Sequence, residues 1–291
     1  MAKSCYWAGG FSGATTAWAT AGNWAGLSVP VSTDTVVLPA GIAYGIAGYN
    51  ASAVALTRFV IEEGYSEDIG SGNTALRIDA DTVDLAGSGT IFLEINRSTT
   101  VDVTKAGPSG GAGTFGLSLT GGSNAALRSR LSSNQTVGVA ASIGDSARFT
   151  AVTIGGAGTV TLGEAVTMTS LTIDGGVVYN SSGASGVVIN AGTVYHRKGD
   201  ITALTQRGGT LNLESGDTIT TMSLYDGFNV KLDNNVKGVT VTTLHIYGAG
   251  TISDPNGRMT VTNATQLHGI EHESVTWTRP PDYTIQFGAI P

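Results

Sequence analysis

Three ionisable side chains alternate with apolar ones in the stretch RIDADTVD, at Arg77, Asp79 and Asp81. Because successive side chains of a strand point to opposite faces, these three would line an outer face. Their alternating neighbours would then enter a core, namely Leu76, Ile78 and Ala80. Paired carboxylates on such a face resemble the acid and base of polysaccharide hydrolases and lyases, or a calcium site.

The residues that follow this strand do not extend such a site. The stretch FLEINRSTT adds only Glu94 and Arg97, whereas a saccharide groove usually has further carboxylates and aromatic platforms on adjacent turns. A solvated face with an arginine to offset its charge is therefore the favoured interpretation. We expect a protein that is not an enzyme and has no catalytic residues.

Two further motifs match patterns of metal or cofactor sites without their structural setting. HGIEH places His268, Glu271 and His272 at a zinc-protease spacing, but Gly269 and the strand-like flanks disfavour the required helix. GAGTFG at 111–116 matches a dinucleotide fingerprint, but no helical pattern follows to hold a pyrophosphate. We therefore expect no metal and no cofactor.

Charge and hydropathy exclude two classes of partner. The net charge is −7, and the 15 lysines and arginines form no basic cluster, which disfavours nucleic acid and anionic membrane surfaces. No stretch approaches 18 uninterrupted apolar residues, so no membrane-spanning helix is expected. Cys5 is the only cysteine, which excludes an intramolecular disulfide.

The composition and a short repeat indicate an all-β solenoid. Only 13% of residues are charged, 42 are glycine, and short stretches such as LTID and LHIY alternate apolar and polar residues. Between residues 151 and 252, three units of 19, 21 and 22 residues, which start at residues 151, 201 and 222, can be laid over one another. Each unit has room for three short strands and three corners, which is one coil of a right-handed parallel β-helix.

A second repeated feature is a glycine, a threonine and an apolar residue in succession. This step starts at Gly89, Gly113, Gly158, Gly192, Gly209 and Gly250. A sandwich or barrel is the competing fold, and the Asp-Gly pairs at 174–175 and 226–227 could form its hairpin turns. The near-constant unit length favours the solenoid.

The two ends of the chain differ from the repeat and suggest a division into 1–33, 34–267 and 268–291. A terminal coil exposes a sheet edge and an open core, so a β-helix needs caps. Five of the twenty aromatic residues fall in the first 24 positions, and Pro30 and Pro39 block strand pairing. We expect an N-terminal cap or arm before the solenoid.

The C-terminal segment 268–291 is predicted to form a second cap or arm. It contains Trp277, Tyr283 and Phe287 beside a Pro-Pro pair that forbids continued strand pairing. Such an arm would fold over the last coil or dock on a neighbouring subunit, and both roles are compatible with the sequence.

The start of the chain resembles a known pattern. Trp7-x-Gly9-Gly10, Asn23-Trp24, Val29-Pro30 and the run DTVVLP at 34–39 resemble the segment that begins β-helical regions in many bacterial surface proteins and in β-helical virion proteins of tailed bacteriophages. The resemblance is confined to these residues and the style of the repeat. It implies the fold more than any activity.

The resemblance and the composition together suggest a virion protein. The start MAKSCYWAGG lacks the apolar region of a signal peptide, as expected for a phage protein made in the host cytoplasm. We expect a capsid decoration or cement protein on the capsid surface, bound to the major capsid protein and forming a homotrimer. Aromatic residues dominate interface energetics, so the predicted contact or cap residues are Trp7, Trp24, Pro30, Trp277, Tyr283 and Phe287.

Two other functions stay open at this point. One is a phage tailspike or fibre that binds or cleaves host polysaccharide, in which Asp79 and Asp81 would act. The other is a fragment of a bacterial surface adhesin. The isolated histidines His196 and His245 lie in strand-like segments and are expected to be surface or packing residues.

Overall fold

The computed structural model describes residues 2–71, 74–87, 89, 91–95, 100–103, 115–119, 125–131, 136–138, 148–156, 159–164, 166–266 and 275–278. The chain divides into two compact units, Met1–Val166 and Thr167–Pro291. Within each unit the named strands pair in parallel with strands one turn away, which confirms the predicted parallel β-helix. Hairpin pairing, which a sandwich or barrel needs, is not found between any of the described strands.

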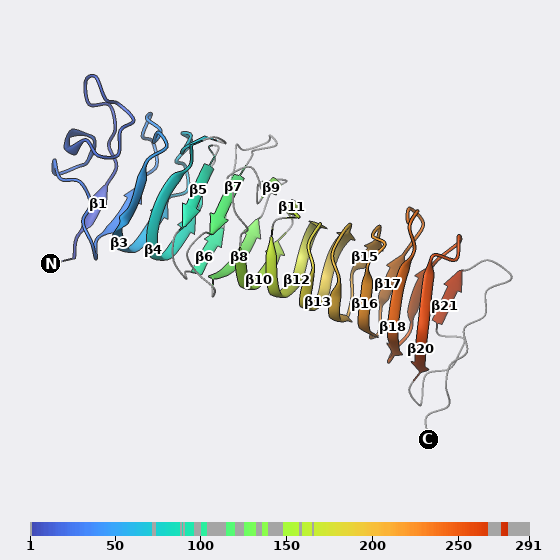
Figure 1. Cartoon of the computed structure of the whole chain (residues 1–291). Helices are drawn as coiled ribbons and strands as arrows, with labels where there is room; N and C mark the ends of the chain where they lie inside the picture. The colour runs from blue at the N-terminus through green and yellow to red at the C-terminus, as the bar shows by residue number, and fades with distance from the viewer. Residues whose placement is uncertain are drawn as a thin grey trace. The chain divides into compact units, whose positions relative to one another are not determined.

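The first unit begins its parallel ladder earlier than expected. Its elements, blue to green in Figure 1, are β1 (Ser4–Tyr6), the short 3-10 turn η1 (Ala21–Asn23), β2 (Thr35–Leu38), β3 (Asn50–Ile61), β4 (Leu76–Leu85), β5 (Ile91–Ile95), β6 (Thr100–Val103), β7 (Phe115–Leu119), β8 (Ala125–Leu131), β9 (Thr136–Gly138), β10 (Arg148–Gly156) and β11 (Thr159–Leu162). Strand β1 pairs with β2 in the register Ser4↔Thr35, so the ladder starts before residue 34.

The second unit contains the most regular part of the repeat. Its strands, yellow to red in Figure 1, are β12 (Thr167–Asn180), β13 (Ala184–His196), β14 (Ile201–Gln206), β15 (Thr210–Leu213), β16 (Thr218–Leu224), β17 (Phe228–Lys231), β18 (Val239–Ile246), β19 (Gly250–Ser253), β20 (Met259–Gln266) and β21 (Val275–Thr278). Strand β21 pairs with β19, with Trp277 beside Ile252. The ladder therefore also continues into the segment predicted as a C-terminal arm.

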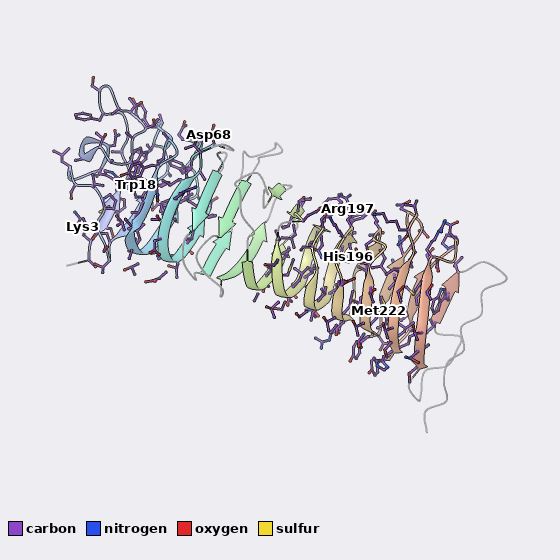
Figure 2. All side chains as sticks on the ribbon, in the orientation of Figure 1. Lys3, Trp18, Asp68, His196, Arg197 and Met222 are labelled. Atoms are coloured by element: carbon purple, nitrogen blue, oxygen red, sulfur yellow. The ribbon has the colours of Figure 1, made fainter. Side chains whose placement is uncertain are left out.

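Inward side chains of successive turns stack in columns that form the core of the second unit. One column is entirely buried and consists of Leu171, Val187, Leu204, Met222 and Leu244. Figure 2 labels Met222 in this unit. Each such side chain contributes about 1.5–3 kcal/mol when it leaves water, which makes these columns the main source of stability.

The step of glycine, threonine and apolar residue marks the same place in successive turns. Val194 pairs with Leu211, Leu211 with Val230, and Val230 with Ile252. Three of these four apolar residues follow a Gly-Thr pair, and all four are buried. The motif therefore places a buried residue at equivalent positions of successive turns, which is consistent with the repeat that the sequence indicated.

Some corners lie inside strands and were hidden in the sequence pattern. In β16, Ile219 and Met222 are buried, and the two residues between them both point outward. Perfect alternation would allow only one, so the strand turns a corner there. The turn length varies: within the second unit, paired residues are 16 positions apart at Met168 and Ala184 and 25 positions apart at Gly250 and Val275.

Candidate docking site on the N-terminal cap

The acidic strand β4 has the alternation that the sequence predicted. Leu76, Ile78 and Ala80 are fully buried, while Arg77 and Asp81 are exposed. Between those two, Asp79 is half-buried on the same outer side. The three candidate residues therefore share one side of β4. Asp81 is the last of the three and lies where β4 turns a corner.

On the preceding turn, strand β3 does not extend this acidic side into a groove. Asp79 lies beside Ala55 of β3, so the residue opposite it on that strand is not a second carboxylate. Beyond the corner, Asp84 forms an exposed ion pair with Arg58. Such surface pairs contribute little to stability.

Several predicted site residues lie outside the described residues. These are His268, Glu271, His272, Tyr283 and Phe287. Where the structure describes the chain, it contains no group of three or more side chains placed to hold a metal ion. Nor does a helix long and apolar enough to cross a membrane occur among the residues described.

The cap predicted at the N-terminus is built around three tryptophans. Trp7 and Trp24 meet edge to face with centroids 5.1 Å apart, and Trp18 meets Trp24 at 4.8 Å. Trp18, labelled in Figure 2, also stacks on Phe59 of β3 at 6.4 Å. Edge-to-face pairs of this kind add about 0.5–1.5 kcal/mol beyond the area that they bury.

This packing places three of the predicted contact or cap residues inside the cap. The side chains of Trp7 and Trp24 are buried, and their indole N–H groups donate to the carbonyls of Tyr44 and Trp18, respectively. Pro30 is buried as well. All three support the cap from inside, so their side chains are not available to a partner.

Asn23 closes the loop between the first two tryptophans. Its side-chain oxygen accepts a hydrogen bond from the backbone N–H of Phe11 at 2.8 Å. Its side-chain nitrogen donates to the carbonyls of Ala14 at 2.6 Å and Ala17 at 2.9 Å. A buried amide that satisfies its partners in this way fixes the path of the surrounding backbone.

Asp34 fixes the other end of the cap. Its buried carboxylate accepts hydrogen bonds from the backbone N–H groups of Lys3 and Val31 and from the thiol of Cys5. Burial alone would raise the pKa of Asp34, but these hydrogen bonds and the Lys3 charge together lower it. Burial, together with Asp34, raises the pKa of Cys5 to about 11, so this thiol is unreactive at neutral pH.

The cap also covers the open edge of the first strand. The backbone N–H of Ala25 donates to the carbonyl of Tyr6 in β1 at 2.9 Å. The opposite side of β1 pairs with β2. Since an unpaired edge is a template for pairing with other chains, this contact prevents uncontrolled stacking at the N-terminus.

The outside of the cap exposes an unusual concentration of apolar side chains, which we call the cap surface. Six of the eight exposed large hydrophobic residues in the described part of the chain belong to it: Tyr6, Phe11, Leu27, Val31, Tyr44 and Tyr49. Residues 1–49 contain only two charged side chains, Lys3 and Asp34, and Asp34 is buried. The cap surface thus carries one charge, on an otherwise acidic chain.

Glycines hold two of these rings against the backbone. A β-carbon at Gly9 would lie 2.4 Å from Cβ of Tyr44, and one at Gly22 would lie 2.0 Å from the ring of Phe11. Gly9 also has a φ of 61°, a left-handed conformation that favours glycine. The resemblance included Gly9, but the rings that it supports were not predicted. The lack of charge over residues 1–49 was the signal that could have revealed this surface.

A second set of aromatic residues lies on the second unit. Tyr179 stacks on Tyr195, and Tyr225 stacks on Tyr247, each pair with centroids 4.8 Å apart. The guanidinium of Arg197 lies over the ring of Tyr179 at 4.3 Å. Because these ring faces cover one another, the pairs resemble cross-strand stabilising contacts more than platforms for a sugar.

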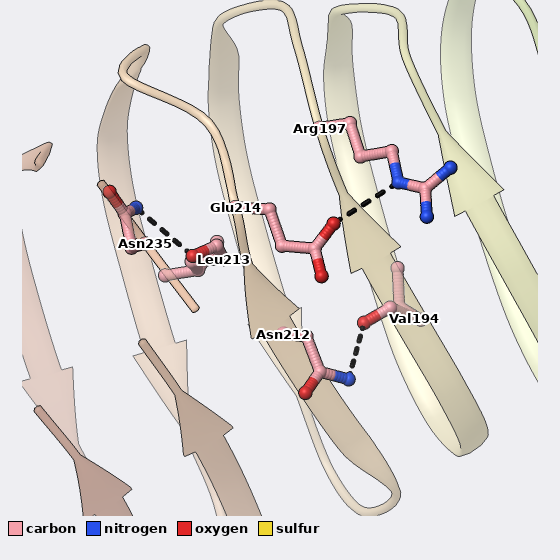
Figure 3. A network of polar contacts seen from close by, with 6 residues as sticks. All are labelled: Val194, Arg197, Asn212, Leu213, Glu214 and Asn235. Carbon is pink, nitrogen blue, oxygen red and sulfur yellow. Dashed lines mark hydrogen bonds and ion pairs between the residues drawn. The ribbon is translucent and has the colours of Figure 1, made fainter. Parts of the chain in front are cut away.

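The polar network around Arg197 has a similar structural role. Its Nε donates to Glu214 on the next turn at 3.1 Å, and Asn212 donates to the carbonyl of Val194 at 3.2 Å (Figure 3). These contacts join adjacent turns and leave the cap surface as the strongest candidate site. Comparison of the chain with protein-family models, curated proteins and solved structures found no match in any of the three.

Proposed function

We propose that this protein is a structural component of a tailed-bacteriophage virion, a capsid decoration or cement protein bound to the major capsid protein. The observation that carries the proposal is the cap surface. It is rigidly supported by buried tryptophans, rich in exposed aromatic residues and almost free of charge. Exposed apolar patches of this kind are typical of protein–protein interaction sites.

Binding through a rigid surface would stabilise the shell by linkage. A ligand that binds the assembled lattice and not its separate subunits lowers the free energy of the assembled state. A preformed cap loses little conformational entropy on binding, which leaves more of the contact energy for affinity. We further propose that the protein acts as a homotrimer on the capsid surface, after synthesis in the host cytoplasm.

Cryo-electron microscopy of particles that contain this protein tests the proposal. The expected result is many icosahedrally ordered copies on the head, with residues 1–49 toward the capsid shell. Copies found only at the tail tip, or bound through the second unit, would contradict it. Light scattering of the purified chain separately tests the trimer.

One observation favours a second function, a tailspike or fibre that binds or cleaves host polysaccharide. Arg77, Asp79 and Asp81 lie on one side of β4, as a saccharide site would require. In this case the double variant Asp79→Ala with Asp81→Ala would abolish glycan binding or turnover. Equal glycan binding by the double variant and the wild type would remove this alternative.

A further inference from the structure

Backbone strain and apolar exposure coincide in one loop of the cap. In the described part of the chain, the two residues other than glycine with positive φ are Leu27, at 55°, and Thr33, at 75°. Left-handed backbone costs an ordinary side chain about 1–2 kcal/mol. The side chain of Leu27 is also 73% exposed, so its position recovers little burial energy. Glycine or asparagine would be better tolerated here on both grounds.

Buried neighbours hold this loop, residues 25–33, in its strained form. At its start, the N–H of Leu27 donates to the carbonyl of Trp24 at 2.9 Å. At its end, Asp34 accepts a hydrogen bond from Val31 at 3.0 Å, and the N–H of Thr33 donates to the carbonyl of Ala55 at 2.7 Å. The conformation is thus imposed by the cap, which is how strain persists at functional sites.

The loop presents two apolar side chains beside one positive charge. Leu27 and Val31 point into solvent, while Pro30 between them is buried. The ammonium group of Lys3 donates to the side-chain oxygen of Ser28 at 2.8 Å, which places the only exposed charge of residues 1–49 at this loop. The surface is therefore apolar with a positive margin, whereas the whole chain has a net charge of −7.

We propose that the loop 25–33 is the anchor of the cap surface, in which Leu27 and Val31 enter an apolar pocket of the capsid protein. This inference rests on the proposed function and names the part of the cap that makes the contact. By charge complementarity, a carboxylate at the edge of that pocket faces Lys3. The strain at Leu27 is retained because the side chain must be presented ready for binding, which reduces the entropy lost on association.

The test compares two substitutions of equally exposed side chains. Leu27→Asn removes the apolar group at a position where asparagine tolerates positive φ. Val236→Asn is the matched control, because Val236 is 75% exposed on a corner of the second unit. The probe is phage heads produced without this protein, to which each purified chain is added in a sedimentation assay.

If the loop is the anchor, Leu27→Asn should weaken binding without lowering stability. Leu27→Asn should weaken binding to the heads about tenfold or more while leaving the melting temperature equal or higher. Val236→Asn should leave binding within about twofold of wild type, since a residue outside the contact contributes little. Lys3→Glu should weaken binding as well, because it reverses the charge that faces the pocket.

Each contrary result has a distinct meaning. Equal binding by Leu27→Asn and wild type would overturn the anchor and leave the proposed function standing. A lower melting temperature for Leu27→Asn would show that Leu27 supports the fold, which also overturns the anchor. If wild type itself does not bind the heads, the proposed function fails and the anchor with it. If Leu27→Asn instead abolishes self-association of the pure chain, the occupant is a second copy.

Discussion

The side-chain nitrogen of Asn180 lies 3.2 Å from Nδ1 of His196, at a buried corner of the second unit. The other ring nitrogen, Nε2, lies 2.8 Å from the carbonyl oxygen of Gly199. The amide nitrogen can only donate and the carbonyl oxygen can only accept, so Nδ1 accepts and Nε2 carries the proton. His196 (labelled in Figure 2) is therefore neutral in the folded protein.

This arrangement predicts that the protein is less stable in mild acid. Burial lowers the pKa of His196 below 6.5, although Gly199, Asp217 and Asp200 oppose the shift. The unfolded chain then binds more protons than the folded one below pH 6.5, so stability falls as the pH falls. For one group the loss is at most about 1.4 kcal/mol per pH unit. Urea unfolding at pH 8 and pH 5 measures it.

The control for this prediction is His196→Leu. Leucine is already tolerated at the equivalent position of the next turn, where Leu213 pairs with His196. The substitution should flatten the difference between the two pH values, apart from the contribution of carboxylates. An unchanged pH dependence in His196→Leu would show that His196 does not cause it.

Removing a cap tryptophan should destabilise the first unit. Trp24→Ala deletes the ring that contacts both Trp7 and Trp18, and we expect a loss of about 3–5 kcal/mol. Urea unfolding followed by tryptophan fluorescence reports the change. Tyr49→Ala, at an exposed position of the same cap, should change stability by no more than about 0.5 kcal/mol. Equal effects of the two would contradict a buried tryptophan core.

Two glycines of the second unit should respond in opposite ways to alanine. Gly209 has a φ of 67°, and a β-carbon there would lie 2.5 Å from the carbonyl oxygen of Gly192 on the preceding turn. Gly209→Ala should therefore lower the free energy of unfolding by at least about 1 kcal/mol. Gly186 has open space around it and ordinary φ, so Gly186→Ala should be neutral or stabilising. Thermal unfolding of both variants makes the comparison.

Asn235 should be the critical residue of its corner. Its nitrogen donates to the carbonyls of Leu213 and Ser215 on the preceding turn, the first of which is drawn in Figure 3. Its oxygen accepts from the backbone N–H groups of Lys237 and Gly238. Asn235→Ala leaves these buried backbone groups without their hydrogen-bond partner, and it should lower the free energy of unfolding by about 1–3 kcal/mol or more.

The adjacent asparagine provides the comparison. Asn234 is exposed, so Asn234→Ala should change the unfolding midpoint little. A similar loss for both variants would mean that the corner is sensitive to any alanine, and that the four hydrogen bonds of Asn235 are not the cause.

The sequence predicted those parts of the fold that depend on local periodicity. Strict alternation placed Leu76, Ile78 and Ala80 in the core. The repeated glycine step marked Val194 and Leu211, which the structure places in one column. Both follow from the two-residue period of a strand and the regular return of a corner. Corners without glycine, such as that within β16, disturb the alternation by one residue and were missed.

The candidate site was harder to predict because burial at a chain end depends on distant contacts. Tryptophan is a residue type that often anchors interfaces, but Trp7 and Trp24 are buried in the cap, next to the loop that Asn23 holds by hydrogen bonds. Phe11, Leu27 and Tyr44 are exposed instead. No local sequence pattern distinguishes these residues from the buried aromatic ones. The positive φ of Leu27 was likewise not predicted, because this conformation is usually adopted by glycine or asparagine.

The reactivity of the buried Cys5 thiol reports on opening of the N-terminal cap. With its pKa raised to about 11 and its hydrogen bond to Asp34, Cys5 should stay unmodified by alkylating reagents while the cap is closed. No other cysteine competes for the reagent, so the labelling rate measures how often the N-terminus opens. Copies of the protein can also meet at high density without cross-linking through sulfur, even in an oxidising medium.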